Sequence, residues 1–273
     1  MLAGTRRADP KISPNWRVAL EKTLKVVSSG VVVLATMKIH AIAFDADDTL
    51  WHNEDHFAAT EDAFAEMMAP WATEEEARQA LFSVETQNLD LFGYGVKAFT
   101  LSMIEAAMEL SAGSISSADL GILLERGKSM LERPAELLPG VAEVLHDLHG
   151  THHLILITKG DLHHQERKVQ GSGVAHFFNA IEVVTEKNMA TYRRIAVAHH
   201  IDPTEFVMVG NSIKSDILPV VELGGFGIHI PYEFTWAHEK VSSHATPQNE
   251  PGARMWELTS IKEVPALIEA LRT

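Results

Sequence analysis

Cysteine is absent from the 273 residues of the chain. This absence excludes a disulfide framework, thiolate chemistry and a cysteine-ligated zinc site, and it is compatible with the cytoplasmic location that we expect. Basic residues are also scarce, because 23 Lys and Arg stand against 37 Asp and Glu. A formal charge of −14 leaves no basic stripe for a phosphate backbone, so we expect no nucleic-acid partner.

Hydrophobic residues make up 46% of the chain, enough to bury the core of one large domain or two modest ones. Residues 1–37 differ from the rest, since basic side chains are followed by an apolar run as in a signal peptide. A core strand begins directly afterwards, at residue 38 or 39. We therefore interpret residues 1–37 as an N-terminal extension, with a misassigned start favoured over export or a membrane anchor, and expect no membrane partner.

The most informative stretch of the sequence is residues 41–51, AIAFDADDTLW. Its apolar beginning is typical of a strand that is buried on both faces, as in parallel sheets. The acids Asp45, Asp47 and Asp48 follow at the carboxyl end of that strand, where open α/β sheets bind ligands. Burying several carboxylates together is costly, and a nearby cation would remove that cost. The alternative is a solvated helix start that Asp48 or Thr49 caps.

Three later strands are also predicted to end in polar groups: residues 154–157, 180–184 and 206–209. Helical patterns separate these strands, which favours an α/β fold with a parallel sheet. Between the first strand and the second, residues 55–136 have helical periodicity and no strong strand signal. The two glycines around Tyr94 interrupt this helical region. The groups that follow the three later strands are Thr158 with Lys159, then Lys187, then Asn211 with Asp216.

The Asp-x-Asp-x-Thr pattern after an apolar strand resembles the first motif of the haloacid dehalogenase-like hydrolase superfamily. Thr158, Lys187 and the segment 210–216 are similar to its second, third and fourth motifs, in the same order. The resemblance implies a doubly wound parallel-sheet core over residues 38–54 and 137–273. It also implies an inserted all-helical cap domain over residues 55–136.

The resemblance further implies roles for individual residues. Asp45 would be the nucleophile that forms an aspartyl-phosphate, and Asp47 would be the general acid and base. Thr158 and the backbone amide of Lys159 would bind phosphoryl oxygens. Lys187 would neutralise the nucleophile and the incoming phosphate. Lys168 is the alternative for that position, and Lys187 is favoured because it follows a strand and begins a helix.

A magnesium ion is the cofactor that this resemblance implies. Its ligands would be the carboxylates of Asp45 and Asp216, the backbone carbonyl of Asp47, and water molecules, one of them held by Asn211. Asn211 departs from the acidic residue that many family members have at this position. Oxygen ligands alone suit a hard cation of this kind.

The expected activity is magnesium-dependent hydrolysis of a small phosphorylated metabolite, which would be the partner of the protein. The acidic Asp47 favours phosphoryl chemistry over carbon–halogen chemistry, because a halide leaves without a proton. A metal-independent 2-haloacid dehalogenase, a phosphomutase and a catalytically silent binding protein remain alternatives. Trp51 and Tyr94 are candidate substrate-binding residues. The sequence does not indicate the substrate itself or the oligomeric state.

Overall fold

The structure is a computed structural model that describes residues 38–233 and 253–272. The expected N-terminal extension, residues 1–37, lies outside the described residues. Within the described ranges, no helix combines the length and the apolar character that a membrane span requires.

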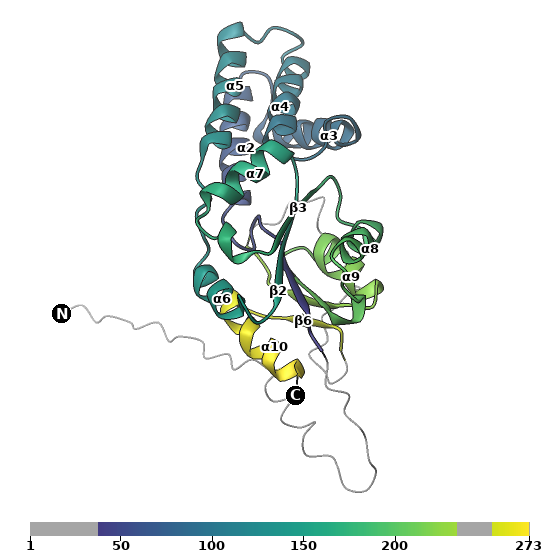
Figure 1. Cartoon of the computed structure of the whole chain (residues 1–273). Helices are drawn as coiled ribbons and strands as arrows, with labels where there is room; N and C mark the ends of the chain where they lie inside the picture. The colour runs from purple at the N-terminus through teal and green to yellow at the C-terminus, as the bar shows by residue number, and fades with distance from the viewer. Residues whose placement is uncertain (1–37, 234–252, 273) are drawn as a thin grey trace, which may run out of the picture.

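A six-stranded parallel sheet forms the centre of the fold (Figure 1). Its strand order is β3-β2-β1-β4-β5-β6, and every neighbouring pair is parallel. The sheet confirms the expected doubly wound α/β fold. The strands are β1 (Ala41–Phe44), β2 (His153–Lys159), β3 (Ala180–Val184), β4 (Phe206–Gly210), β5 (Phe226–His229) and β6 (Met255–Glu257).

Strand β1 is buried on both faces because helices cover both sides of the sheet. Ile42 and Phe44 belong to the hydrophobic cluster on one face, while Ala41 and Ala43 belong to the cluster on the other. These two clusters explain why an uninterrupted apolar run, rather than an alternating one, forms this strand. The first face packs against α6 (Val141–Leu148), α7 (Leu162–Gly171) and α10 (Val264–Arg272), and the second against α8 (Met189–Ala198) and α9 (Leu218–Glu222) (Figure 1).

The strand order creates a crevice beside β1. After β1 the chain forms β2 and β3 on one side, then returns to form β4 on the other side of β1. The connections on the two sides of β1 therefore diverge at the carboxyl ends of β1 and β4. Open α/β sheets bind their ligands at such a switch point.

Four helices lie between β1 and α6 and are called the cap helices below. They pack around a hydrophobic cluster of their own, which includes Phe64, Leu81, Phe99 and Met103. This arrangement agrees with the helical character expected for residues 55–136, while the exact division into a core domain and a cap domain stays a prediction. The cap helices are α2 (Glu54–Met68), α3 (Glu74–Phe92), α4 (Val96–Leu110) and α5 (Ser117–Glu132).

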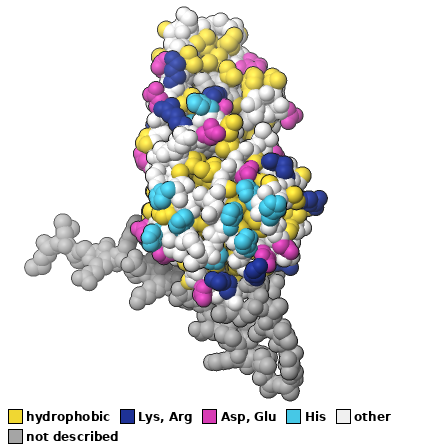
Figure 2. All heavy atoms as spheres, in the orientation of Figure 1, with side chains coloured by type: hydrophobic (Ala, Val, Ile, Leu, Met, Phe, Trp, Pro, Cys, Tyr) yellow, Lys and Arg dark blue, Asp and Glu magenta, His cyan; other side chains and the backbone are white. Residues whose placement is uncertain are grey.

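The sequence analysis missed strand β6, which pairs with β5 at the edge of the sheet. Its three residues follow a polar stretch and are too few to show a periodicity. On the face shown in Figure 2, histidine side chains gather over the half that contains the sheet. Lys and Arg side chains are scattered among acidic ones on this face, so their charges do not form a stripe there.

Candidate active site

The tip of β1 places Asp45 at one end of a buried row of three charged groups. Its backbone N–H donates to Val209 O at 2.9 Å, which keeps the residue in line with the sheet. The carboxylate is 5% exposed and accepts a hydrogen bond from Thr49 Oγ1 at 2.9 Å. The Lys187 ammonium donates to Asp45 and also to Asp216 Oδ1, the latter at 2.7 Å. One buried cation therefore joins two buried carboxylates.

The three charged groups Asp45, Lys187 and Asp216 include two acids and one base. Burial, together with the charge of Asp216, raises the pKa of Asp45 to about 7 against the opposing effect of Lys187. The two carboxylates also raise the pKa of Lys187, although burial alone would lower it. Lys187 is therefore a fixed positive charge, and an additional cation beside the two acids would stabilise their ionised forms.

Asp216 owes its position to the wide turn that follows β4. Ser212 N–H donates to Asp216 Oδ2 at 3.0 Å. Ile217 N–H donates to Ser212 O at 3.3 Å, which closes a π-type turn. Such five-residue turns are rare and are frequent at functional sites. Gly210 makes the close approach possible, because a Cβ at this position would lie 2.3 Å from Asp216 Oδ2. The sequence pattern did not predict this packing role of Gly210.

Replacing Gly210 by alanine is expected to lower the free energy of unfolding by about 2 kcal/mol or more, because the buried Asp216 carboxylate cannot move away from the new methyl group. Urea denaturation measures this change. Gly121→Ala is the matched control: its Cβ would meet nothing within 4 Å in α5, and the change should stabilise the protein by about 0.5–1 kcal/mol. Equal stability of Gly210→Ala and the wild type would contradict the packing argument.

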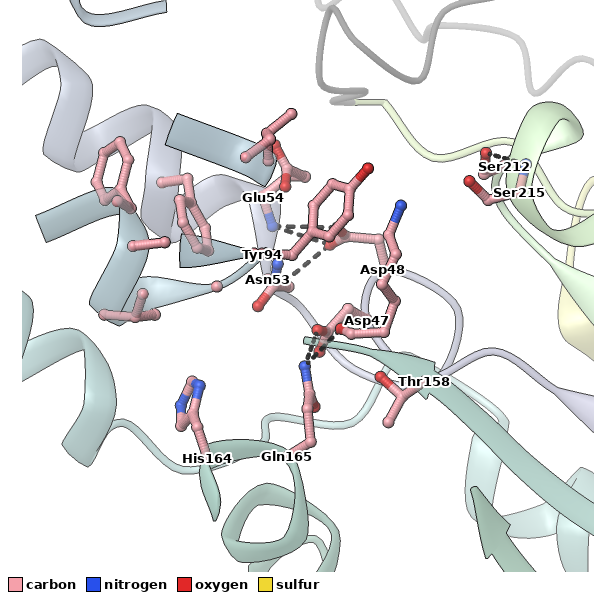
Figure 3. Close-up of a pocket in the computed structure, with 18 of the residues that line it drawn as sticks. Asp47, Asp48, Asn53, Glu54, Tyr94, Thr158, His164, Gln165, Ser212 and Ser215 are labelled. Carbon is pink, nitrogen blue, oxygen red and sulfur yellow. Dashed lines mark hydrogen bonds between the residues drawn. The ribbon is translucent and has the colours of Figure 1, made fainter. Parts of the chain in front are cut away.

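Asp47 lies beside Asp45 but is held by different residues. Its carboxylate accepts hydrogen bonds from Gln165 Nε2 at 2.8 Å (Figure 3), from Trp51 Nε1 at 2.6 Å and from the Lys168 ammonium. Burial would raise the pKa of Asp47, but the Lys168 charge and these hydrogen bonds outweigh it and hold the pKa below its ordinary value. In this conformation Asp47 is an ionised carboxylate.

Two residues weighed in the sequence analysis have different surroundings from those expected. Trp51 was expected to line a substrate pocket, but it is 0% exposed. Its buried indole N–H donates a hydrogen bond to Asp47 Oδ1. Lys168, the alternative to Lys187, contacts Asp47 and Asn53 Oδ1, the latter at 2.9 Å, rather than Asp45. The sequence analysis missed Gln165 as a partner of Asp47. Its three-residue spacing from Lys168 on a predicted helix was the available signal.

Asp48 accepts hydrogen bonds from backbone N–H groups at the beginning of α2. Its φ of 62° turns the chain, and its carboxylate accepts hydrogen bonds from the backbone N–H groups of Asn53 at 2.8 Å and Glu54 at 3.1 Å. This is the helix-capping role that the sequence analysis weighed for the acid cluster. Burial, with the charges of Asp47 and Glu54, raises the pKa of Asp48 to about 8.

A cavity of about 170 Å³ separates the tips of β1, β2 and β4 from the cap helices. The structure brings most of the expected site residues to this cavity. Thr158 is 1% exposed, and its Oγ1 has no hydrogen-bond partner among the described residues. Expected residues on the cavity wall are Asp45, Asp47, Tyr94, Thr158, Lys159, Lys187, Asn211 and Asp216.

Tyr94 and Lys159 form a contact between the cap helices and the sheet. Tyr94 Oη donates to Glu186 Oε2 at 2.9 Å, and the Lys159 ammonium lies 3.9 Å from the centre of the Tyr94 ring. Nearby, Lys97 of α4 pairs with Asp161 at 2.8 Å. These contacts close one side of the cavity over the sheet.

The groups around Asp45 fit a hard cation with oxygen ligands. The carboxylates of Asp45 and Asp216 both contact the Lys187 ammonium and both line the cavity. Asn211 lies on the same cavity wall, with its Oδ1 3.5 Å from Thr49 Oγ1. The described part of the chain contains no group of three His, Cys, Asp or Glu side chains that could hold a metal ion. This donor set suits Mg²⁺, because that ion binds few protein ligands and keeps several water molecules.

The fold and this site together define a class of hydrolases. The family model for haloacid dehalogenase-like hydrolases matches residues 39–224. The chain belongs to the haloacid dehalogenase-like hydrolase family. A haloacid dehalogenase-like family hydrolase from Xanthomonas campestris is 38% identical to it, with a TM-score of 0.76 over 86% of this chain and 92% of that chain.

Two more distant relatives indicate the range of the fold. The pyrimidine 5'-nucleotidase YjjG of Escherichia coli K12 is 24% identical over 248 residues, which cover 85% of this chain and 99% of YjjG. The L-2-haloacid dehalogenase of Xanthobacter autotrophicus with covalently bound chloropropionic acid is 17% identical, with a TM-score of 0.56 over 85% of this chain and 98% of that chain. The likeness to the dehalogenase shows a common fold alone.

Proposed function

We propose that the protein hydrolyses a small phosphomonoester through an aspartyl-phosphate on Asp45, with Mg²⁺ as cofactor. The observation that carries this proposal is the buried row in which Lys187 joins Asp45 to Asp216. Asp47, two residues beyond the nucleophile, supplies a second carboxylate on the same cavity wall. A nucleophile, a fixed cation and a separate acid–base group are the parts that this reaction needs.

In the first step, a carboxylate oxygen of Asp45 bonds to phosphorus while the bond from phosphorus to the leaving oxygen breaks. Asp47 gives its proton to that oxygen. The negative charge of the arriving phosphate raises the pKa of Asp47 and favours its protonated form. In the second step, water attacks phosphorus, Asp47 takes a proton from this water, and the bond to Asp45 breaks to release phosphate. The ionised Asp47 in this structure matches the second step.

Other residues of the cavity would hold the phosphoryl group. The unpartnered hydroxyl of Thr158 and the backbone amide of Lys159 are candidates to donate to its oxygens. Lys187 adds a positive charge whose position is fixed by Asp45 and Asp216. Fixed donors of this kind stabilise the charge that develops in the transition state.

Mg²⁺ would be held by the carboxylates of Asp45 and Asp216, the backbone carbonyl of Asp47 and a water molecule on Asn211. When bound, it would screen the negative charges of the nucleophile and the phosphate from each other. Burial and the charge of Asp216 raise the pKa of Asp45 to about 7, and a bound cation would offset both effects, which supports this assignment.

The activity of one relative also supports a phosphorylated substrate. YjjG is a pyrimidine 5'-nucleotidase, and its length is matched almost completely. The dehalogenase relatives, in contrast, share the fold at low identity. We therefore favour phosphatase chemistry for this chain.

The test is hydrolysis of p-nitrophenyl phosphate by the full chain with Mg²⁺, with EDTA, and after Mg²⁺ is added back. We expect turnover with Mg²⁺, a loss of at least about 100-fold with EDTA, and recovery on addition of metal, because the unscreened carboxylates repel the phosphate. The parallel assay measures halide release from 2-chloropropionate with EDTA present. Halide release in EDTA without any phosphatase activity would replace the proposal with a dehalogenase.

A further inference from the structure

The cap side of the cavity is acidic. Glu54 and Glu61 of α2 and Glu85 of α3 all line it. Within residues 38–233 and 253–272, no hydrogen bond or ion pair reaches the Glu85 carboxylate. Burial and the charges of Glu61 and Glu54 raise the pKa of Glu85 to about 8. We call these three carboxyl groups and the cavity wall that they form the acidic recess.

The nearby cations have other partners. Arg78 lies 3.8 Å from Glu61, but its guanidinium also donates to Glu74 Oε1 at 2.9 Å and to Asp62. Of the two lysines on the cavity wall, Lys187 is held between Asp45 and Asp216, and the Lys159 ammonium lies over the Tyr94 ring, 3.7 Å from Glu186. No cation is among the groups that shift the pKa of Glu85.

An independent feature on the sheet side of the cavity also indicates a ligand. The buried oxygens Thr158 Oγ1 and Gln165 Oε1 have no hydrogen-bond partner among the described residues. Both side chains line the cavity and are at most 4% exposed. Figure 3 shows them on the side of Asp47 opposite to Glu54. Buried polar atoms nearly always have a partner, so a water molecule or a bound ligand is expected to contact these two oxygens.

Apolar side chains occupy the cavity wall on the cap side. Phe57, Leu89, Val96 and Phe99 line it, from α2, α3 and α4. They suit the carbon skeleton of an organic molecule with polar groups at its two ends. A phosphate would occupy the sheet end, and the far end would face Glu85.

We propose that the enzyme selects phosphomonoesters whose leaving group carries a protonated amine, which pairs with Glu85 in the acidic recess. This inference rests on the proposed phosphatase function. A charge-assisted hydrogen bond in a partly buried site would favour such substrates over neutral ones of the same size. The positive charge of the bound ammonium would lower the pKa of Glu85 and favour its ionised form, whereas a carboxylate or a second phosphate on the leaving group would be repelled by the negative charge of the recess.

A matched series of substrates tests this inference. We would measure kcat/KM with Mg²⁺ for ω-aminoalkyl phosphates with three to six carbons, for alkyl phosphates of the same length, and for the ω-carboxyalkyl phosphates. At the best length, the ammonium substrate should exceed the alkyl one by about 10-fold or more, since one such hydrogen bond changes a rate constant by about that factor. The carboxylate substrate should be the poorest of the three.

Two variants on α3 test whether the acidic recess causes the preference for ammonium substrates. Glu85→Gln should reduce the ratio of ammonium to alkyl kcat/KM to near 1, mainly through KM, while thermal denaturation checks that the variant is folded. Glu75→Gln makes the same substitution at an exposed position of the same helix and should keep the wild-type ratio. Glu61→Gln provides a second recess variant if Glu85→Gln does not fold.

The outcomes separate the two proposals. Hydrolysis of all three substrate types without a preference for the ammonium group would overturn the recess inference and leave the phosphatase proposal intact. A preference that Glu85→Gln and Glu61→Gln both retain would also overturn it. Absence of turnover with every phosphomonoester, including p-nitrophenyl phosphate, would overturn the phosphatase proposal and the recess inference with it.

Discussion

Asp45→Asn is expected to reduce phosphomonoester hydrolysis by at least about 1000-fold, because the amide cannot act as the nucleophile that accepts the phosphoryl group. The substitution keeps the shape of a side chain that is 5% exposed. The single amide oxygen can still accept from Lys187, and the amide NH₂ then takes the place of Oδ2 and faces the Thr49 hydroxyl, which can accept a hydrogen bond. Because it replaces a buried carboxylate by a neutral group, the folded state should not lose stability. Steady-state kinetics with p-nitrophenyl phosphate and a thermal melt measure the two effects.

Asp147→Asn is the control for this experiment, since Asp147 is an exposed acid of α6, away from the cavity wall. It should have wild-type kinetics. A covalent phosphoryl group would also be detected by mass spectrometry of the acid-quenched wild type and should be absent from Asp45→Asn. Residual activity of Asp45→Asn above a few per cent of wild type would show that Asp45 does not form the intermediate.

Lys187→Met is expected to destabilise the protein and to inactivate it. Without the ammonium, the buried carboxylates of Asp45 and Asp216 face each other without their shared partner. Removing one partner from a buried ion pair costs about 3–5 kcal/mol. Urea denaturation in EDTA measures that loss, and kinetics with Mg²⁺ should show a decrease in kcat of at least about 100-fold through the lost charge stabilisation.

A double variant separates the effect of Lys187 on stability from its effect on the reaction. Lys187→Met with Asp216→Asn removes one cation and one of its two carboxylates, so it should recover much of the lost stability while activity stays low. Lys128→Met on the exposed face of α5 is the control for loss of a lysine and should change neither quantity. Wild-type stability of Lys187→Met in EDTA would contradict the role of Lys187 as the partner of both acids.

The central part of the site could be predicted because it depends on strand ends. Buried apolar runs identified β1, β2 and β4, and the carboxyl ends of parallel strands meet at one edge. That rule was enough to expect Asp45, Thr158 and Asp216 close together. It also favoured Lys187, which follows β3, as the lysine near Asp45.

The remaining contacts depend on how helices pack, which the sequence pattern does not define. Gln165 and Lys168 reach Asp47 because of the position of α7 on the sheet. Trp51 was assigned to the pocket because an aromatic side chain fits a pocket wall and a core equally well by composition. The acidic recess was not predicted, since Glu61 and Glu85 are 24 positions apart on different helices and resemble ordinary solvent-facing acids.

The placement of α2 to α5 between β1 and α6 has a consequence for how such an enzyme diversifies. Every group proposed to react with phosphorus comes from the sheet edge, whereas the recess that would choose the leaving group comes from α2 and α3. Mutations in these two helices can therefore accumulate without altering the bond-making residues. A duplicated gene could acquire a new physiological role by small steps, each of which retains a working reaction centre.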